Sequence, residues 1–163
     1  MFLDASRVQY RKPQLVEVIC QLRFPEILTI AAEPPARFQD AIRSEYPQFH
    51  RRQELQPPKV VGNPGSFALE NQPANVNYQF STGDGVWRVN LTSKFISLAC
   101  TNYTCWEDFA AHLDRPLAAF IQIYKPAYFE RVGLRYLNFI SRKELSLENT
   151  PYRDLIAPCW LGP

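Results

Sequence analysis

Residues 101–140, TNYTCWEDFAAHLDRPLAAFIQIYKPAYFERVGLRYLNFI, decide the fold class of this chain. The first half carries apolar residues at helical spacing. The second half is rich in aromatic residues and carries two arginines, Arg131 and Arg135, at the spacing of one strand face. A helix that leads into a long strand is typical of an α+β core. The stretch therefore predicts an architecture, and it contains no signature of a particular chemistry.

The predicted helix begins near Thr104 and ends before Pro126. Thr104 and Glu107 have the spacing of a capping box, in which each side chain pairs with the backbone of the other residue. Pro116 interrupts the interior and predicts a kink or two short helices. The apolar stripe of this segment consists of Trp106, Phe109, Leu113, Leu117, Phe120 and Tyr124. We expect the first five of these residues to be buried against a sheet.

Outward from this stretch, alternating apolar residues predict further strands. The first strand is expected in QLVEVICQLRF (14–24), and a short helix is expected in EPPARFQDAIRSEYP (33–47). Three strands should then meander through 76–100. Between these segments, in 48–75, only KVVG and SFALE resemble short strands. The last strand is expected within 128–141.

The predicted order β-α-β-β-β-α-β indicates an α+β fold. It consists of an antiparallel sheet of about five to six strands with two helices packed on one face. We assign 8–145 to a single domain and 146–163 to a C-terminal extension or to the start of a missing second segment. The sheet face without helices is then left for solvent, a partner or that missing segment.

Composition narrows the class of protein. With 163 residues, 46% of them hydrophobic and 21% charged, the chain has the composition of one globular domain. The net charge of +2 and the lack of a run of like charges require neither nucleic acid nor a membrane as partner. The segment MFLDASRVQYRKPQ lacks the basic-then-apolar layout of a signal peptide, so we expect none, and the sequence contains no apolar run of ~18 residues. The four cysteines show no disulfide framework, which favours a reducing cytoplasm.

Several short motifs together resemble a sporadically distributed bacterial protein family that has no established activity. They are Pro13, Glu17 and Arg23-Phe24, then Tyr46-Pro47, then Tyr103, Trp106 and Phe109, and finally RVGLRYLN at 131–138. The resemblance covers roughly 8–145, and its most specific part is the strand segment GLRYLN. It implies one shared fold and supplies no catalytic residues. Family members usually continue further, so the chain resembles their amino-terminal part.

The chemistry-bearing side chains do not form a recognisable catalytic or metal motif. The spacing of Cys100, Cys105 and His112 matches no common zinc module and lacks an evident fourth ligand. A Cys–His nucleophile pair would need an orienting third group, and only His50 and His112 are available. We therefore predict no catalytic residues, no metal ligands and no cofactor.

The candidate binding surface lies on the first and last strands. It consists of Arg131 and Arg135 on the last strand, with Glu17 and Arg23 on the first. Arginines beside aromatic residues on an open sheet face suit an acidic peptide or single-stranded nucleic acid. In the alternative interpretation, Glu17 pairs with one of the two last-strand arginines across the sheet, and that guanidinium is structural.

Three functional hypotheses remain open from the sequence. The first is a non-enzymatic interaction module that presents this face to another protein or to a second domain of the same chain. The second is a nucleic-acid-binding component, of the kind found in bacterial defence or toxin–antitoxin loci. The third is an unrecognised hydrolase. Homo-oligomerisation is a further alternative for the partner, and a membrane is not expected.

Overall fold

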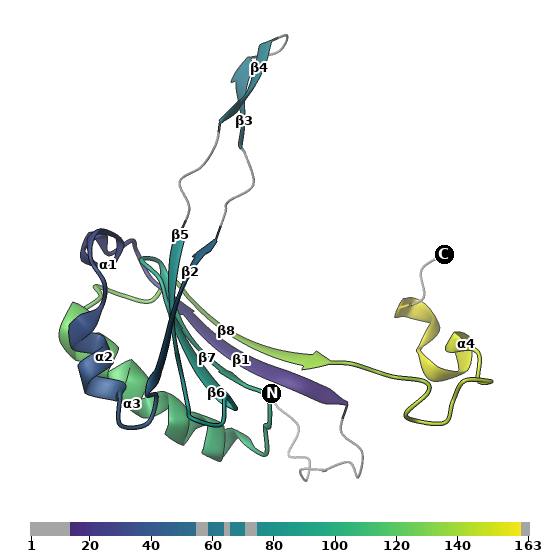
Figure 1. Ribbon diagram of the computed structural model, residues 1–163. Coiled ribbons are helices and arrows are strands. Elements are labelled where there is room, and N and C mark those ends of the chain that lie inside the picture. The colour runs from purple at the N-terminus through teal and green to yellow at the C-terminus, as the bar shows by residue number, and fades with distance from the viewer. Residues whose placement is uncertain (1–13, 55–58, 64–65, 71–74, 161–163) are drawn as a thin grey trace. The chain divides into compact units, whose positions relative to one another are not determined.

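The computed structural model describes residues 14–54, 59–63, 66–70 and 75–160 of the chain (Figure 1). Residues 15–137 form one compact unit, and the described residues 138–160 belong to a second one. The candidate binding residues Glu17, Arg23, Arg131 and Arg135 all lie in the first unit. Within the described ranges, no helix is both long enough and apolar enough to cross a membrane.

A six-stranded sheet forms the centre of the first unit and confirms the predicted α+β class. The strand order is β2-β5-β6-β7-β1-β8, and β2, β5, β6, β7 and β1 pair antiparallel. The strands are β1 (Leu15–Arg23), β2 (Gln48–Glu54), β5 (Asn75–Ser81), β6 (Trp87–Leu91), β7 (Phe95–Cys100) and β8 (Arg131–Asn138). A separate two-stranded sheet is formed by β3 (Lys59–Asn63) and β4 (Ser66–Glu70).

Helices cover one face of the main sheet, as Figure 1 shows. They are α1 (Leu28–Ala32), α2 (Ala36–Ile42) and α3 (Trp106–Tyr124). The second unit contains the short α4 (Tyr152–Leu155) and a 3-10 turn at Pro158–Trp160. The helices α2 and α3 correspond to the two predicted ones. The five-residue α1 was not expected, because its segment shows no helical periodicity of its own.

Aromatic contacts join the helices to the sheet and mark the core. Their ring centroids lie 4.6 Å apart for Phe24–Phe120, 5.4 Å for Phe38–Phe80 and 5.6 Å for Trp87–Phe109. Between the helices, the hydroxyl of Tyr46 donates to the carbonyl of His112 at 3.0 Å. Burial raises the pKa of Tyr46, so this hydroxyl keeps its proton to donate.

The start of α3 differs from the prediction in two ways. The N-cap is Cys105 and no side chain caps the helix, so the predicted capping box is wrong. The Thr104 hydroxyl donates instead to the Asp108 carboxylate at 3.2 Å. Trp106 was expected in the core but is 41% exposed. It stacks on the outer side of Phe109, with 5.9 Å between the ring centroids, and Phe109 takes the buried position.

The rest of α3 follows the predicted stripe more closely. Phe109, Leu113 and Phe120 are buried, and Leu117 is half-buried. One helix runs through Pro116, which is itself buried, instead of two short helices. A proline removes one backbone hydrogen bond from a helix, and packing against the sheet compensates for this loss.

The strand β2 lies in a segment for which only KVVG and SFALE were predicted as strands. Its sequence, QFHRRQE, has no apolar alternation. Phe49 pairs in register with Phe80 of β5, and their ring centroids lie 5.4 Å apart, whereas the neighbouring side chains are polar. An edge strand of this kind is held by its backbone ladder more than by burial, which is why the apolar pattern did not reveal it.

The turn between β5 and β6 contains Gly83, Asp84 and Gly85. Gly85 adopts a φ of 73°, a left-handed conformation that suits glycine. The Thr82 hydroxyl at 2.5 Å and the Val86 N–H at 3.1 Å both donate to Oδ1 of Asp84. These two hydrogen bonds, the one from Thr82 above all, hold the pKa of the Asp84 carboxyl below its ordinary value.

Replacing Asp84 with asparagine is therefore expected to destabilise the protein at neutral pH and to lose this effect in acid. A carboxyl whose pKa is lowered in the folded state contributes stability above the pKa of the unfolded chain. That contribution disappears as the pH falls through the folded-state pKa. Urea midpoints of the two proteins should differ at neutral pH and converge once the pH is below the folded-state pKa of Asp84. A difference that stays constant down to this pH would contradict the assignment.

Candidate binding face of the sheet

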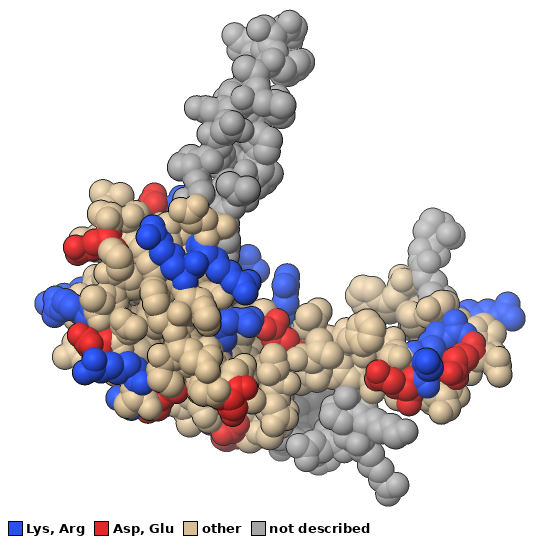
Figure 2. All heavy atoms as spheres, viewed as in Figure 1, with Lys and Arg blue, Asp and Glu red and all other residues tan. Residues whose placement is uncertain are grey.

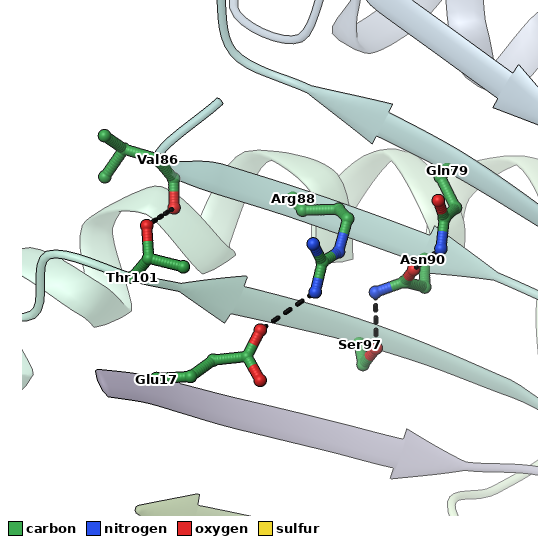
Figure 3. A network of polar contacts seen from close by, with 7 residues as sticks. All are labelled: Glu17, Gln79, Val86, Arg88, Asn90, Ser97 and Thr101. Carbon is green, nitrogen blue, oxygen red and sulfur yellow. Dashed lines mark hydrogen bonds and ion pairs between the residues drawn. The ribbon is translucent and has the colours of Figure 1, made fainter. Parts of the chain in front are cut away.

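The sheet face away from the helices carries a row of hydrogen-bonded polar side chains (Figure 3). In register, Gln79 of β5 lies opposite Asn90 of β6, and Asn90 lies opposite Ser97 of β7. The Gln79 amide donates to Oδ1 of Asn90 at 3.0 Å, and the Asn90 amide donates to the Ser97 hydroxyl at 3.3 Å. Asn90 and Ser97 are buried, and polar groups buried without a hydrogen-bond partner would lower the stability of the fold. These hydrogen bonds avoid that cost.

Glu17 and Arg88 form the ion pair of this face. The Nη2 atom of Arg88, on β6, lies 2.8 Å from Oε1 of Glu17, on β1, across the intervening strand β7 (Figure 3). Glu17 therefore does form a cross-strand ion pair, but its partner is Arg88 and not Arg131 or Arg135 as predicted. The Glu17 carboxylate is already neutralised within the sheet by Arg88, so it is not the charge partner of Arg131 or Arg135.

Arg88 and Gln79 were missed by the sequence interpretation. The segment WRVNL places Trp87, Val89 and Leu91 toward the helices, where all three are buried. The alternation then puts Arg88 and Asn90 on the other face. That signal was present in the sequence, but nothing in it identified which carboxylate faces Arg88.

Arg131 and Arg135 come together at the border of β1 and β8. They line one surface hollow of about 290 Å³ with Gly133 and with Ile19 and Gln21 of β1. Both arginine side chains are exposed. Among the described residues, neither has an ion-pair or hydrogen-bond partner. The hollow thus presents two guanidinium groups that have no acidic partner in the described part of the chain, and they favour an anionic occupant.

Arg23 lies apart from this hollow. It ends β1 as an exposed residue, and its carbonyl accepts a hydrogen bond from the Glu130 N–H at 2.8 Å. The four predicted binding residues therefore separate into three environments. Arg131 and Arg135 share the hollow, Glu17 pairs with Arg88, and Arg23 contributes an exposed charge at the end of β1.

The strand β8 is also apolar and exposed. Val132 is 65% exposed and Leu134 44%, and Tyr136 and Leu137 are exposed to a similar degree. In the sheet order β8 is an outer strand with β1 as its neighbour. Apolar side chains gathered on an outer strand are unusual, because such an edge favours pairing with another chain.

A second hollow, of about 370 Å³, lies between the α1–α2 connection and the end of α3. It is larger, but Glu33 and Arg37 both line it, so its charges oppose one another. Tyr124 also lines it, and burial raises the pKa of Tyr124 to about 12. Its described lining thus has no excess of charge of either sign that would select a ligand, and we do not assign this hollow a function.

The cysteine and histidine candidates occupy structural positions. Cys100 is buried at the end of β7, and burial raises the pKa of its thiol, which is the opposite of what a nucleophile needs. His112 stacks on Trp87 with 3.8 Å between the ring centroids. In the described part of the chain, no three His, Cys, Asp or Glu side chains are grouped closely enough to hold a metal ion.

No protein-family model, curated protein or solved structure matches this chain. The functional argument therefore rests on the geometry of the open face and of β8.

Proposed function

We propose that this chain is a non-enzymatic interaction module that binds another protein, or a second domain of the same chain, through β8 and the adjoining open face. The supporting observation is the exposed outer strand, which combines apolar side chains with Arg131 and Arg135. An apolar strip next to exposed arginines has the composition of a protein-binding surface. The four free cysteines fit a reducing compartment, so we propose that the module acts in the cytoplasm.

The alternative is a nucleic-acid-binding component. It is favoured by the Lys and Arg side chains that gather over the region of β2 and β5 in the view of Figure 2. Against it, the aromatic residues Tyr78, Phe80 and Trp87 of the paired strands are buried in the core. Bases of a single strand need exposed aromatic rings on which to stack. The described open face offers amides and arginines instead, and we place this function second.

A photo-crosslinking experiment tests the proposal. A photoreactive amino acid placed at Leu134 in the full chain, expressed in its native host, is expected to form a discrete protein adduct. The same group at the exposed Ala118 of α3 is the matched control and should form none. The adduct at Leu134 should be lost when Arg131 and Arg135 are both changed to glutamine, with the circular-dichroism spectrum unchanged.

Oligonucleotide binding tests the alternative. Fluorescence polarisation with single- and double-stranded oligonucleotides at low ionic strength is expected to show no saturable binding. Micromolar binding that falls steeply with added salt, and that the same double substitution abolishes, would replace the first proposal with the second. An adduct at Leu134 that consists of nucleic acid would lead to the same conclusion.

A further inference from the structure

The two outer strands of the main sheet differ in how they are protected. On β2, the described side chains after Phe49 are His50, Arg51, Arg52 and Gln53, and all are exposed and polar. Charged side chains of this kind keep an edge strand from pairing with other chains. On β8, the described side chains alternate instead between arginines and exposed apolar residues. Of the two edges, β8 is therefore the one suited to accept another strand.

The alternation along β8 determines what that strand must carry. Arg131, Gly133 and Arg135 occupy every second position, and Val132, Leu134 and Tyr136 occupy the positions between them. Successive side chains of a strand point to opposite faces, so one face of β8 is cationic and the other is apolar. A strand added beside β8 continues both faces. Its best match therefore alternates acidic with apolar side chains.

Gly133 leaves room for an acidic side chain between the two arginines. A Cβ atom built at this position would meet only the guanidinium of Arg131, with Nε and Nη2 at 3.8 Å. The hollow lined by Arg131, Gly133 and Arg135 is consequently open to a carboxylate from a partner. A carboxylate there would lie between two guanidinium groups that have no acidic partner among the described residues.

We propose that β8 binds an extended protein segment in which acidic and apolar residues alternate, and that this segment adds to the sheet as a further strand. The inference rests on the proposed interaction function and adds the chemistry and the conformation of the partner. Backbone hydrogen bonds to the outer edge of β8 supply affinity, and the two alternating faces supply specificity. The carboxylates of the segment bind in the hollow at Arg131 and Arg135.

A second copy of the same strand is a poorer occupant. Pairing β8 with β8 of another molecule would bring arginines against arginines on the shared face. Like charges on directly opposite strand positions are destabilising. Dimerisation through β8 is therefore disfavoured by repulsion between the arginines. A partner strand with acidic side chains would attract them instead.

The test uses the full chain and a synthetic acetylated peptide, TEVEVEVT, labelled for fluorescence anisotropy at low ionic strength. We expect saturable binding that weakens at least about tenfold when Arg131 and Arg135 are both changed to glutamine. The matched control changes Arg37 and Arg43, exposed on the helix side, to glutamine and should leave binding unchanged. A peptide of the same composition with grouped residues, TEEEVVVT, should bind at least about tenfold more weakly, because it cannot match both faces.

Backbone methylation of the peptide tests strand addition directly. In an added strand, the N–H groups of alternate residues point to β8 and the others point away. One peptide methylated at the glutamate nitrogens and one methylated at the valine nitrogens should therefore differ, with binding retained by one and lost by the other. Equal binding of the two peptides would overturn strand addition and leave only charge attraction to the arginines.

A substitution at Gly133 tests the hollow. Gly133→Glu places a carboxylate of the chain itself between the two guanidinium groups and should weaken TEVEVEVT binding at least about tenfold. Gly133→Gln, nearly the same in shape but neutral, is the control and should retain binding within about threefold. Denaturation midpoints of both variants establish that they fold. Equal loss in the two variants would mean that bulk, and not charge, closes the hollow, and it would overturn the carboxylate assignment.

The outcomes separate this inference from the proposed function. If no peptide binds while crosslinking at Leu134 still captures a protein, the acidic-strand inference is wrong and the interaction function stands. If neither occurs, both are wrong. Self-association of the chain that involves Leu134, measured by analytical ultracentrifugation with and without the Arg131→Gln and Arg135→Gln changes, would replace the acidic partner with a second copy.

Discussion

Replacing Phe120 with alanine is expected to lower the free energy of unfolding by about 3–5 kcal/mol. The side chain is fully buried at the centre of the helix–sheet interface. Its ring lies 4.6 Å from that of Phe24, 5.5 Å from that of Tyr124 and 6.4 Å from that of Phe129. Truncation removes contacts with the residue that follows β1, with its own helix and with the segment that enters β8. The cavity left there cannot close without moving all three.

Chemical denaturation followed by circular dichroism measures this effect. The neighbouring Ile121→Ala is the matched control, because Ile121 lies on the same helix and is exposed. It should change stability by no more than about 0.5–1 kcal/mol. Similar losses for the two variants would mean that α3 is not packed on the sheet through the face that contains Phe120.

Replacing Arg88 with alanine is expected to destabilise the protein by about 1–2 kcal/mol, the second-largest effect. The substitution leaves the carboxylate of Glu17 without its partner, and the Glu17 side chain is only 20% exposed. The Arg88 side chain is 40% exposed, and this partial access to water keeps the effect below that of a fully buried pair. Loss of the packing of the long arginine side chain across the sheet adds to the same effect.

A double-mutant cycle with Glu17→Gln isolates the interaction. If the pair is formed as described, the double variant should be more stable than the sum of the two single effects predicts. Strict additivity would contradict the pair. The exposed pair of Lys94 with Glu26, 3.7 Å apart, provides a control, since Lys94→Ala should cost no more than about 0.5–1 kcal/mol.

The predictions that held are those that depend on local periodicity. Val18, Cys20 and Leu22 alternate in the sequence and are buried in β1. Phe38 and Ile42 recur at helical spacing and are buried on α2. These patterns reveal buried faces because the spacing of side chains along a strand or helix is a property of the backbone itself.

The prediction for Trp106 failed because periodicity does not give the length of the covered surface. Trp106 continues the apolar stripe of α3, but it is the first residue of the helix. Phe109 already fills the position against Trp87, so the Trp106 ring lies outside it, with one face in solvent. How far the sheet extends beneath a helix depends on the positions of the other strands. The local sequence of the helix does not contain that information.

The sequence by itself determined the helices α2 and α3, most of the strands and the alternation that places the arginines of β8 on one face. The tertiary structure alone decided which charges meet. Strand order puts β7 and β6 on one side of β1 and β8 on the other, so Glu17 reaches Arg88 and leaves Arg131 and Arg135 beside a shared hollow. Charge pairing across a sheet depends on distances between strands far apart in the chain, and these distances are set by long-range packing rather than by any local pattern.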